Sequence, residues 1–161
     1  MLAKIREMLY QLRNLSDSEK QVMLDGPIWA GLLVGIADGH LDPEEAERIA
    51  SVIKTKTYSE KNDVHFLYQD LAEDHLNEHI DTLAKELSSA FSTEEKVALA
   101  TAKLARLNKP LTKLESGYAK QYTKSLRSIS LAVAKVSGGI FGIGRITEDE
   151  KGMLNLPMIE M

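Results

Sequence analysis

The chain has no cysteine among its 161 residues. This excludes disulfide bonds, thiolate metal sites and a cysteine nucleophile, and with them a secreted disulfide-rich scaffold. A reducing, cytoplasmic environment fits the composition best. Because the chain is long enough to bury a hydrophobic core without covalent cross-links, we expect one domain over residues 1–161.

Long apolar runs are also missing. The longest stretch without a charge, Gly26 to Ala37, is far shorter than the roughly 20 residues that a membrane-spanning helix needs. It therefore predicts a buried helix, and we expect no transmembrane segment. The first residues mix charges with apolar side chains at helical spacing and lack the uninterrupted apolar region of a signal peptide.

Acidic and basic residues are separated along the chain. Residues 38–95 contain 15 acidic and 5 basic residues, whereas residues 96–145 contain 10 basic residues and one acidic residue, Glu115. Two interpretations stay open. Either the two halves pack together and neutralise each other, or a basic face is exposed toward an anionic partner.

Apolar residues recur three or four positions apart along most of the chain, as in Leu76, Ile80, Leu83 and Leu87, and no strand alternation competes with them. Helix starts are indicated by capping boxes, in which a short polar side chain is followed three residues later by Glu. There are five such pairs: Ser16/Glu19, Asp42/Glu45, Ser92/Glu95, Thr112/Glu115 and Thr147/Glu150. Pro27 and Pro43 stand at predicted first helical positions. The pattern predicts an all-α fold, a compact bundle of about seven or eight helices.

An internal repeat is visible at an offset of 70 residues. The segment from Ala37 to Glu45 aligns with the segment from Leu107 to Glu115, and residues 144–150 are a weaker third copy. The shared pattern is a helix, a polar turn and a capped helix. It predicts an internal helix-turn-helix duplication, although common capping chemistry alone would give the same alignment.

The turn of the first copy resembles a known family. The sequence Val34-Gly-Ile-Ala-Asp-Gly-His-Leu-Asp-Pro-Glu-Glu45 is similar to the turn of the tellurite-resistance protein B (TerB-like) family, matching it at Asp38, Gly39, Leu41 and Glu45. The resemblance covers most of residues 25–155 and leaves residues 1–24 as an N-terminal helical segment. It implies a duplicated all-helical domain with a divalent-cation site on acidic turn residues, in bacterial stress-response or membrane-associated systems. The second copy departs from this pattern, because Lys109 stands where glycine is expected.

The first candidate site is a metal site formed by both copies of the turn. If the copies pack about a pseudo-twofold axis, Asp38 and Glu45 would face Asn108 and Glu115. Oxygen ligands of this kind suit calcium or magnesium. The alternatives are that these acidic residues only cap helices or that they form a polar patch for a partner.

The second candidate is the sequence His75-Leu-Asn-Glu78-His79, which fits the H-x-x-E-H arrangement of inverted zinc peptidases. Two histidines four residues apart on one helix can bind a zinc ion, with Glu78 as the base. Against this interpretation, the neighbouring acidic residues indicate a solvated face.

The third candidate is a basic row of Lys113, Lys120, Lys124 and Arg127, spaced by seven, four and three residues and therefore expected on one helical stripe. Such a row can bind phosphates or anionic headgroups. Tyr118 and Tyr122 fall on the apolar side, so the row provides no aromatic side chains for stacking on nucleic-acid bases. A solvated surface is the alternative interpretation.

The leading hypothesis is a non-enzymatic TerB-like binding module with a protein partner, in the cytoplasm or peripheral at the inner face of the membrane. Asp38, Glu45, Asn108 and Glu115 would form its polar centre, with calcium or magnesium as the ligand. The alternatives are an electrostatic adaptor that binds nucleic acid or an anionic membrane, and a metal-dependent hydrolase that uses the histidine pair or the acidic turn.

Overall fold

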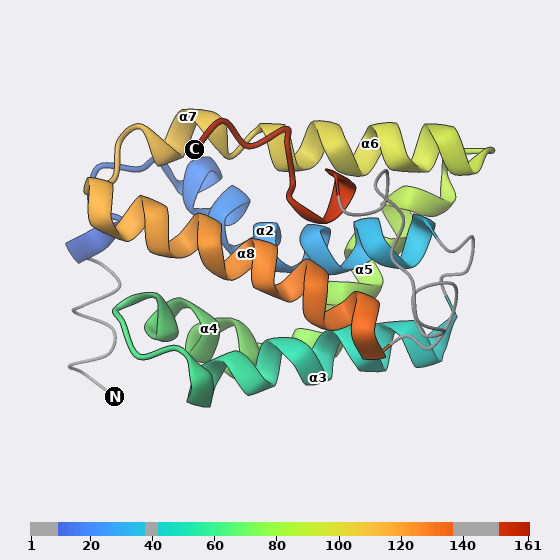
Figure 1. Cartoon of the computed structure of the whole chain (residues 1–161), viewed down its shortest axis with the longest axis horizontal. Coiled ribbons are helices and arrows are strands. Elements are labelled where there is room, and N and C mark those ends of the chain that lie inside the picture. Colours follow the sequence, from blue (N-terminus) through green and yellow to red (C-terminus); the bar gives the residue numbers. More distant parts are fainter. Residues whose placement is uncertain (1–9, 38–41, 137–151) are drawn as a thin grey trace.

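The computed structural model describes residues 10–37, 42–136 and 152–161. Seven helices are described over their full length within these ranges, and no strand is assigned there (Figure 1), which confirms the all-α prediction for this part of the chain. The helices are α2 (Asp17–Ala37), α3 (Pro43–Ser59), α4 (Val64–Glu73), α5 (Leu76–Ser88), α6 (Thr93–Ala105), α7 (Asn108–Leu111) and α8 (Ser116–Val136).

Helix α2 is the centre of the bundle. It contacts α3, α5, α6, α7 and α8, and its buried side chains lie on all of its sides. They are Met23, Ile28, Trp29, Ala30, Leu32, Leu33, Val34 and Ile36. A helix that is apolar all round is expected in the middle of a core. The prediction of a buried helix over Gly26 to Ala37 is therefore confirmed up to Ile36.

The remaining long helices run along α2 in both directions. In Figure 1, α2 and α8 run one way along the long axis of the molecule, and α3 and α6 run the other way. The start of α3 therefore lies at one end of the bundle, whereas α7 and the start of α8 lie at the other end (Figure 1). This placement decides which of the predicted site residues can meet.

Three of the predicted pairs cap helices, and the Ser16/Glu19 pair has both hydrogen bonds of a capping box. The Asp42 carboxylate accepts from the Glu45 amide at 2.9 Å at the start of α3, and Pro43 is the first residue of that helix, as predicted. Ser16 and Glu19 cap each other reciprocally before α2, and Ser92 accepts from the Glu95 amide at α6. Each satisfies a backbone donor that the first helical turn leaves unpaired. The pair Thr147/Glu150 lies outside the described residues.

The capping box predicted at Thr112 and Glu115 is wrong. The Thr112 hydroxyl donates to the Lys109 carbonyl, and α8 begins only at Ser116. The short helix α7 occupies the place that the alignment of the two copies gave to a polar turn. Its main chain is helical here because Lys109 stands where the first copy has glycine, and lysine disfavours a left-handed turn.

One further prediction about α2 is wrong. Pro27 lies inside the helix rather than at its start. Residues 24 and 25, between which the N-terminal segment and the core were divided, also lie within this helix. The Ser16/Glu19 capping box lies well before Pro27, and the helix therefore begins at Asp17. Proline normally interrupts a helix because it has no N–H and its ring meets the preceding turn. Here Tyr122 of α8 donates to the carbonyl that the proline leaves without a helical partner.

Candidate functional site

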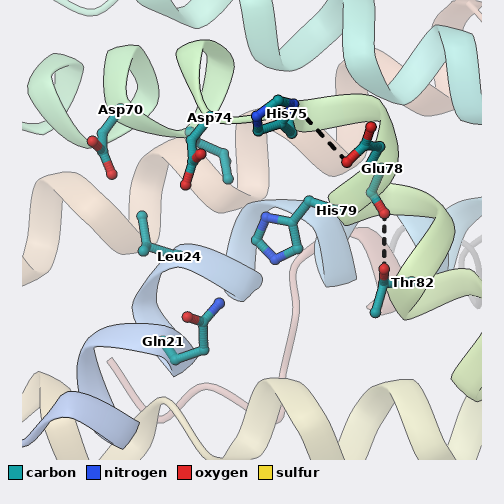
Figure 2. A pocket seen from close by; sticks show the side chains of 9 residues that line it. Gln21, Leu24, Asp70, Asp74, His75, Glu78, His79 and Thr82 are labelled. Carbon is teal, nitrogen blue, oxygen red and sulfur yellow. Dashed lines mark hydrogen bonds and ion pairs between the residues drawn. The ribbon is translucent and has the colours of Figure 1, made fainter.

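The histidine pair lies beside a cavity of about 300 Å³ between α2 and the α4–α5 turn. Figure 2 shows its side chains converging from three helices and the turn between two of them. The lining residues are Gln21, Leu24, Asp70, Leu71, Asp74, His75, Glu78, His79 and Thr82. Three of them are carboxylates. A cavity of this composition favours a cationic group over an anionic one.

His79 is held by α2. Its Nε2 lies 2.6 Å from Oδ1 of Asp25, and the Gln21 amide donates to the same oxygen at 2.9 Å. The side chains of His79 and Asp25 are each about one-fifth exposed, at 19% and 20%. Because Asp25 is 54 residues away from His79, no local pattern in the sequence could have indicated this pair. Both Asp25 and Gln21 were missed for that reason.

His75 does not share a helix with His79. It precedes the first residue of α5 and has a left-handed backbone, with φ of 53°. Its Nδ1 lies 3.9 Å from a carboxylate oxygen of Glu78, and both side chains are mostly exposed. The H-x-x-E-H interpretation required both histidines on one helical face. Among the described residues, no group of three His, Asp or Glu side chains is placed to hold a metal ion.

Glu45, one of the four residues predicted to hold calcium or magnesium, is buried and 5% exposed. Its Oε1 lies 2.7 Å from Nη1 of Arg48, one turn further along α3. A guanidinium at this distance occupies an oxygen that a metal ion would need. Asp38, the predicted companion of Glu45, lies outside the described residues.

Asn108 and Glu115 belong to the other end of the bundle. The Asn108 amide donates to the Met158 carbonyl at 2.8 Å and accepts from the Glu160 amide at 2.9 Å. Glu115 is exposed, and its carbonyl accepts from the Ala119 amide in the first turn of α8. In Figure 1, α7 lies at the other end of the bundle from the start of α3. The structure therefore does not bring Glu45 together with Asn108 and Glu115.

The basic row divides into two engaged and two free side chains. Lys113 precedes α8 instead of lying on it, and its Nζ is 2.8 Å from Oε1 of Glu19. The hydrogen bond from Lys113, aided by the Ser16 amide, lowers the pKa of Glu19 to about 2. Arg127 donates to the main-chain oxygens of Asn155 at 2.8 Å and Met161 at 2.7 Å. Lys113 and Arg127 therefore bind other segments of the same chain and are not free to bind a partner.

Lys120 and Lys124 differ from the other two members of the row. Both are exposed on α8, and neither has a hydrogen bond or an ion pair with any residue that the structure describes. Helix α8 contains no Asp or Glu over its 21 residues. The positive charge on this face is therefore not compensated within its own helix.

The tyrosines of α8 face the core, as predicted. Tyr118 is 4% exposed and Tyr122 is fully buried. The Tyr68 hydroxyl from α4 is 2.6 Å from the Ser125 hydroxyl on the same buried side. Burial raises the pKa of all three phenols. None of them is available to stack on a nucleic-acid base.

None of the helices in the described ranges has the length and hydrophobicity required of a membrane span. No family model matches the chain, and no solved structure matches it. Among curated proteins, the chain is similar to the uncharacterized protein ORF11' of Methanothermobacter thermautotrophicus. The two are 29% identical over 129 residues, which cover 80% of this chain and 80% of the archaeal protein.

Proposed function

We propose that this protein is a non-enzymatic binding module that holds an anionic partner on the exposed face of α8. The observation that carries the proposal is that Lys120 and Lys124 are exposed, lack partners among the described residues and lie on a helix with no acidic residue. Two lysines four residues apart lie on the same side of a helix, separated by about one turn. An anionic group that approaches this side can contact both.

The engagement of the histidines supports a binding role over a hydrolytic one. His79 pairs with Asp25, and His75 stands outside α5 with a left-handed backbone. A zinc-dependent hydrolase needs two ligands and a base that converge on one point. In this fold His79 instead connects α5 to α2, and His75 lies near Glu78 of α5 itself.

The resemblance to the TerB-like family belongs to the same proposal. The helical fold and the Asp42–Glu45 cap after the Ala-Asp-Gly sequence support it. On this view the module acts in a cytoplasmic or membrane-associated stress-response assembly, and the anionic partner is an acidic protein surface in that assembly.

Binding to a labelled polyanion tests the proposal, with heparin as the probe and a series of salt concentrations. We expect binding that weakens as salt increases, because exposed charges are screened within about 10 Å at 0.1 M salt. The variant Lys120→Glu/Lys124→Glu should bind about tenfold more weakly or worse, which corresponds to about 1.4 kcal/mol.

The matched control is Lys61→Glu/Lys85→Glu, which changes the net charge equally at two exposed lysines that do not belong to α8. It should retain most of the affinity. Equal loss in both variants would mean that the probe responds only to net charge, and the proposal would then be wrong.

A further inference from the structure

A groove runs between α3 and α5 on the acidic part of the molecule. It consists of three adjoining hollows of about 450, 210 and 260 Å³, and Asn77 lines all of them. Glu47 lines two of the hollows and Lys54 also lines two. Small side chains, such as Ala46 and Ala50, leave room for groups that enter from outside.

Two exposed carboxylates face the same hollow from opposite sides. Glu47 belongs to α3 and Asp81 to α5, and both line the hollow of about 210 Å³. Neither has a hydrogen bond or ion pair with another described residue. The hollow thus presents two uncompensated negative charges, in the same way that α8 presents the two uncompensated positive charges of Lys120 and Lys124.

The two surfaces of one molecule do not meet each other. Glu47 is near the start of α3 and Lys120 is near the start of α8, and Figure 1 places these helix starts at opposite ends of the bundle. An ion pair joins the acidic and basic segments, from Lys103 to Glu86 at 2.9 Å, but the exposed charges of these two surfaces stay apart. Of the two interpretations that the sequence left open, this arrangement favours an exposed basic face over internal neutralisation.

We propose that a second copy of this chain is a partner of the α8 face, with Lys120 and Lys124 of one copy docking against Glu47 and Asp81 of the next. This inference rests on the proposed function, since it identifies the anionic partner. Charge complementarity favours this orientation over others and speeds the encounter. With a net charge of only −4, the whole chain opposes self-association weakly.

Exposed apolar side chains beside these charges add to the proposed contact between two copies. Leu131 is 38% exposed and lies on the same side of α8 as Lys120 and Lys124, by its spacing of 11 and 7 residues. Tyr58, 88% exposed, lines the groove on α3. Because the two contact surfaces differ, the association is heterologous, and it extends into oligomers unless the geometry closes a ring.

Analytical ultracentrifugation of the full chain over a concentration series, at low and high salt, tests the inference. We expect concentration-dependent association at low salt that disappears at high salt. The variants Lys120→Glu/Lys124→Glu and Glu47→Lys/Asp81→Lys should each remain monomeric, because each places like charges on both surfaces. An equimolar mixture of the two variants should associate again, since every contact between unlike variants pairs opposite charges.

All four altered residues are exposed. Each variant should therefore give the same helical far-UV circular dichroism spectrum as the unaltered protein. Lys61→Glu/Lys85→Glu serves again as the control and should associate normally. The inference is overturned if the unaltered chain stays monomeric at low salt or if the mixture fails to associate. Heparin binding that depends on Lys120 and Lys124 in a chain that stays monomeric would overturn the self-association while leaving the proposed function intact.

Discussion

The Tyr122 hydroxyl donates a hydrogen bond of 2.7 Å to the main-chain oxygen of Met23. Met23 lies four residues before Pro27, so the missing N–H of Pro27 leaves this carbonyl without its helical partner. The Tyr122 hydroxyl of α8 replaces that N–H as the donor to the Met23 carbonyl. Gly26 makes the approach possible, because a Cβ atom at this position would overlap the Tyr122 hydroxyl. Tyr122, far away in the sequence, and Gly26, next to the proline, together explain how α2 continues through Pro27.

The variant Tyr122→Phe tests this relationship. It removes the donor and leaves the Met23 carbonyl unpaired in the core, where an unsatisfied group costs about 1–3 kcal/mol. We expect the free energy of unfolding, measured by urea denaturation, to fall by that amount. Tyr58→Phe is the control because this side chain is 88% exposed, and its effect should stay within about 0.5 kcal/mol. A loss no larger for Tyr122→Phe than for Tyr58→Phe would show that the hydrogen bond does not support the helix.

The features that could be predicted from the sequence are local ones. The capping pairs at Ser16, Asp42 and Ser92 need residues only three positions away, and the buried faces follow from helical spacing. The error in α2 arises because a distant residue decides the outcome. Pro27 depends on Tyr122, 95 positions later in the chain.

The candidate sites were predicted less well for the same reason. Asn108 was aligned with Asp38 as a metal ligand, but its amide binds the main chain of the C-terminal segment. His79 was paired with His75, yet its partner is Asp25 on α2. Neither partner is signalled by spacing along the sequence, because the packing of helices brings them together.

The contact between Glu19 and Lys113 predicts a specific dependence of stability on pH. The fold lowers the pKa of Glu19 from 4.5 to about 2, so the folded state favours the ionised carboxylate. The resulting stability is fully present above about pH 4.5 and is lost as the pH falls through about 2. Thermal unfolding of the unaltered protein and of Glu19→Gln should therefore differ most above this range and converge toward its lower end. A difference between the two that does not change with pH would contradict this prediction.

The C-terminal segment offers a third prediction. Leu154, Leu156 and Ile159 are buried at 6%, 0% and 3% exposure, while Asn108 and Arg127 hold the main chain around them. Asn108→Ala removes both hydrogen bonds of the side-chain amide, including the one from the Glu160 N–H.

Hydrogen exchange measured by mass spectrometry should then become faster in residues 152–161, because local opening needs fewer bonds to break. Lys124→Ala is the matched control, as this exposed side chain contacts none of the segment through a hydrogen bond. If the exchange of this segment is the same in both variants, Asn108 does not hold it, and the buried apolar side chains together with Arg127 are sufficient.

The residues predicted to hold calcium or magnesium lie at two different ends of the bundle. Glu45 is at the start of α3, whereas Glu115 precedes α8 at the opposite end (Figure 1). A divalent cation held by the turn between α2 and α3 would therefore depend on Glu45 and not on Glu115. Arg48 already occupies an oxygen of Glu45, so the cation would have to displace a guanidinium, which favours weak binding.

Calorimetric titration of the chelator-stripped protein with calcium and magnesium measures this directly. We expect that any saturable heat is lost in Glu45→Gln and retained in Glu115→Gln, two substitutions that remove the same charge. Loss of binding in both variants would restore the view that the two turns share one ion, because ligands of a single site act together. Retention in both would place the ion elsewhere and leave Glu45 as a helix-capping residue neutralised by Arg48, since carboxylates in a first helical turn are already stabilised by the helix dipole.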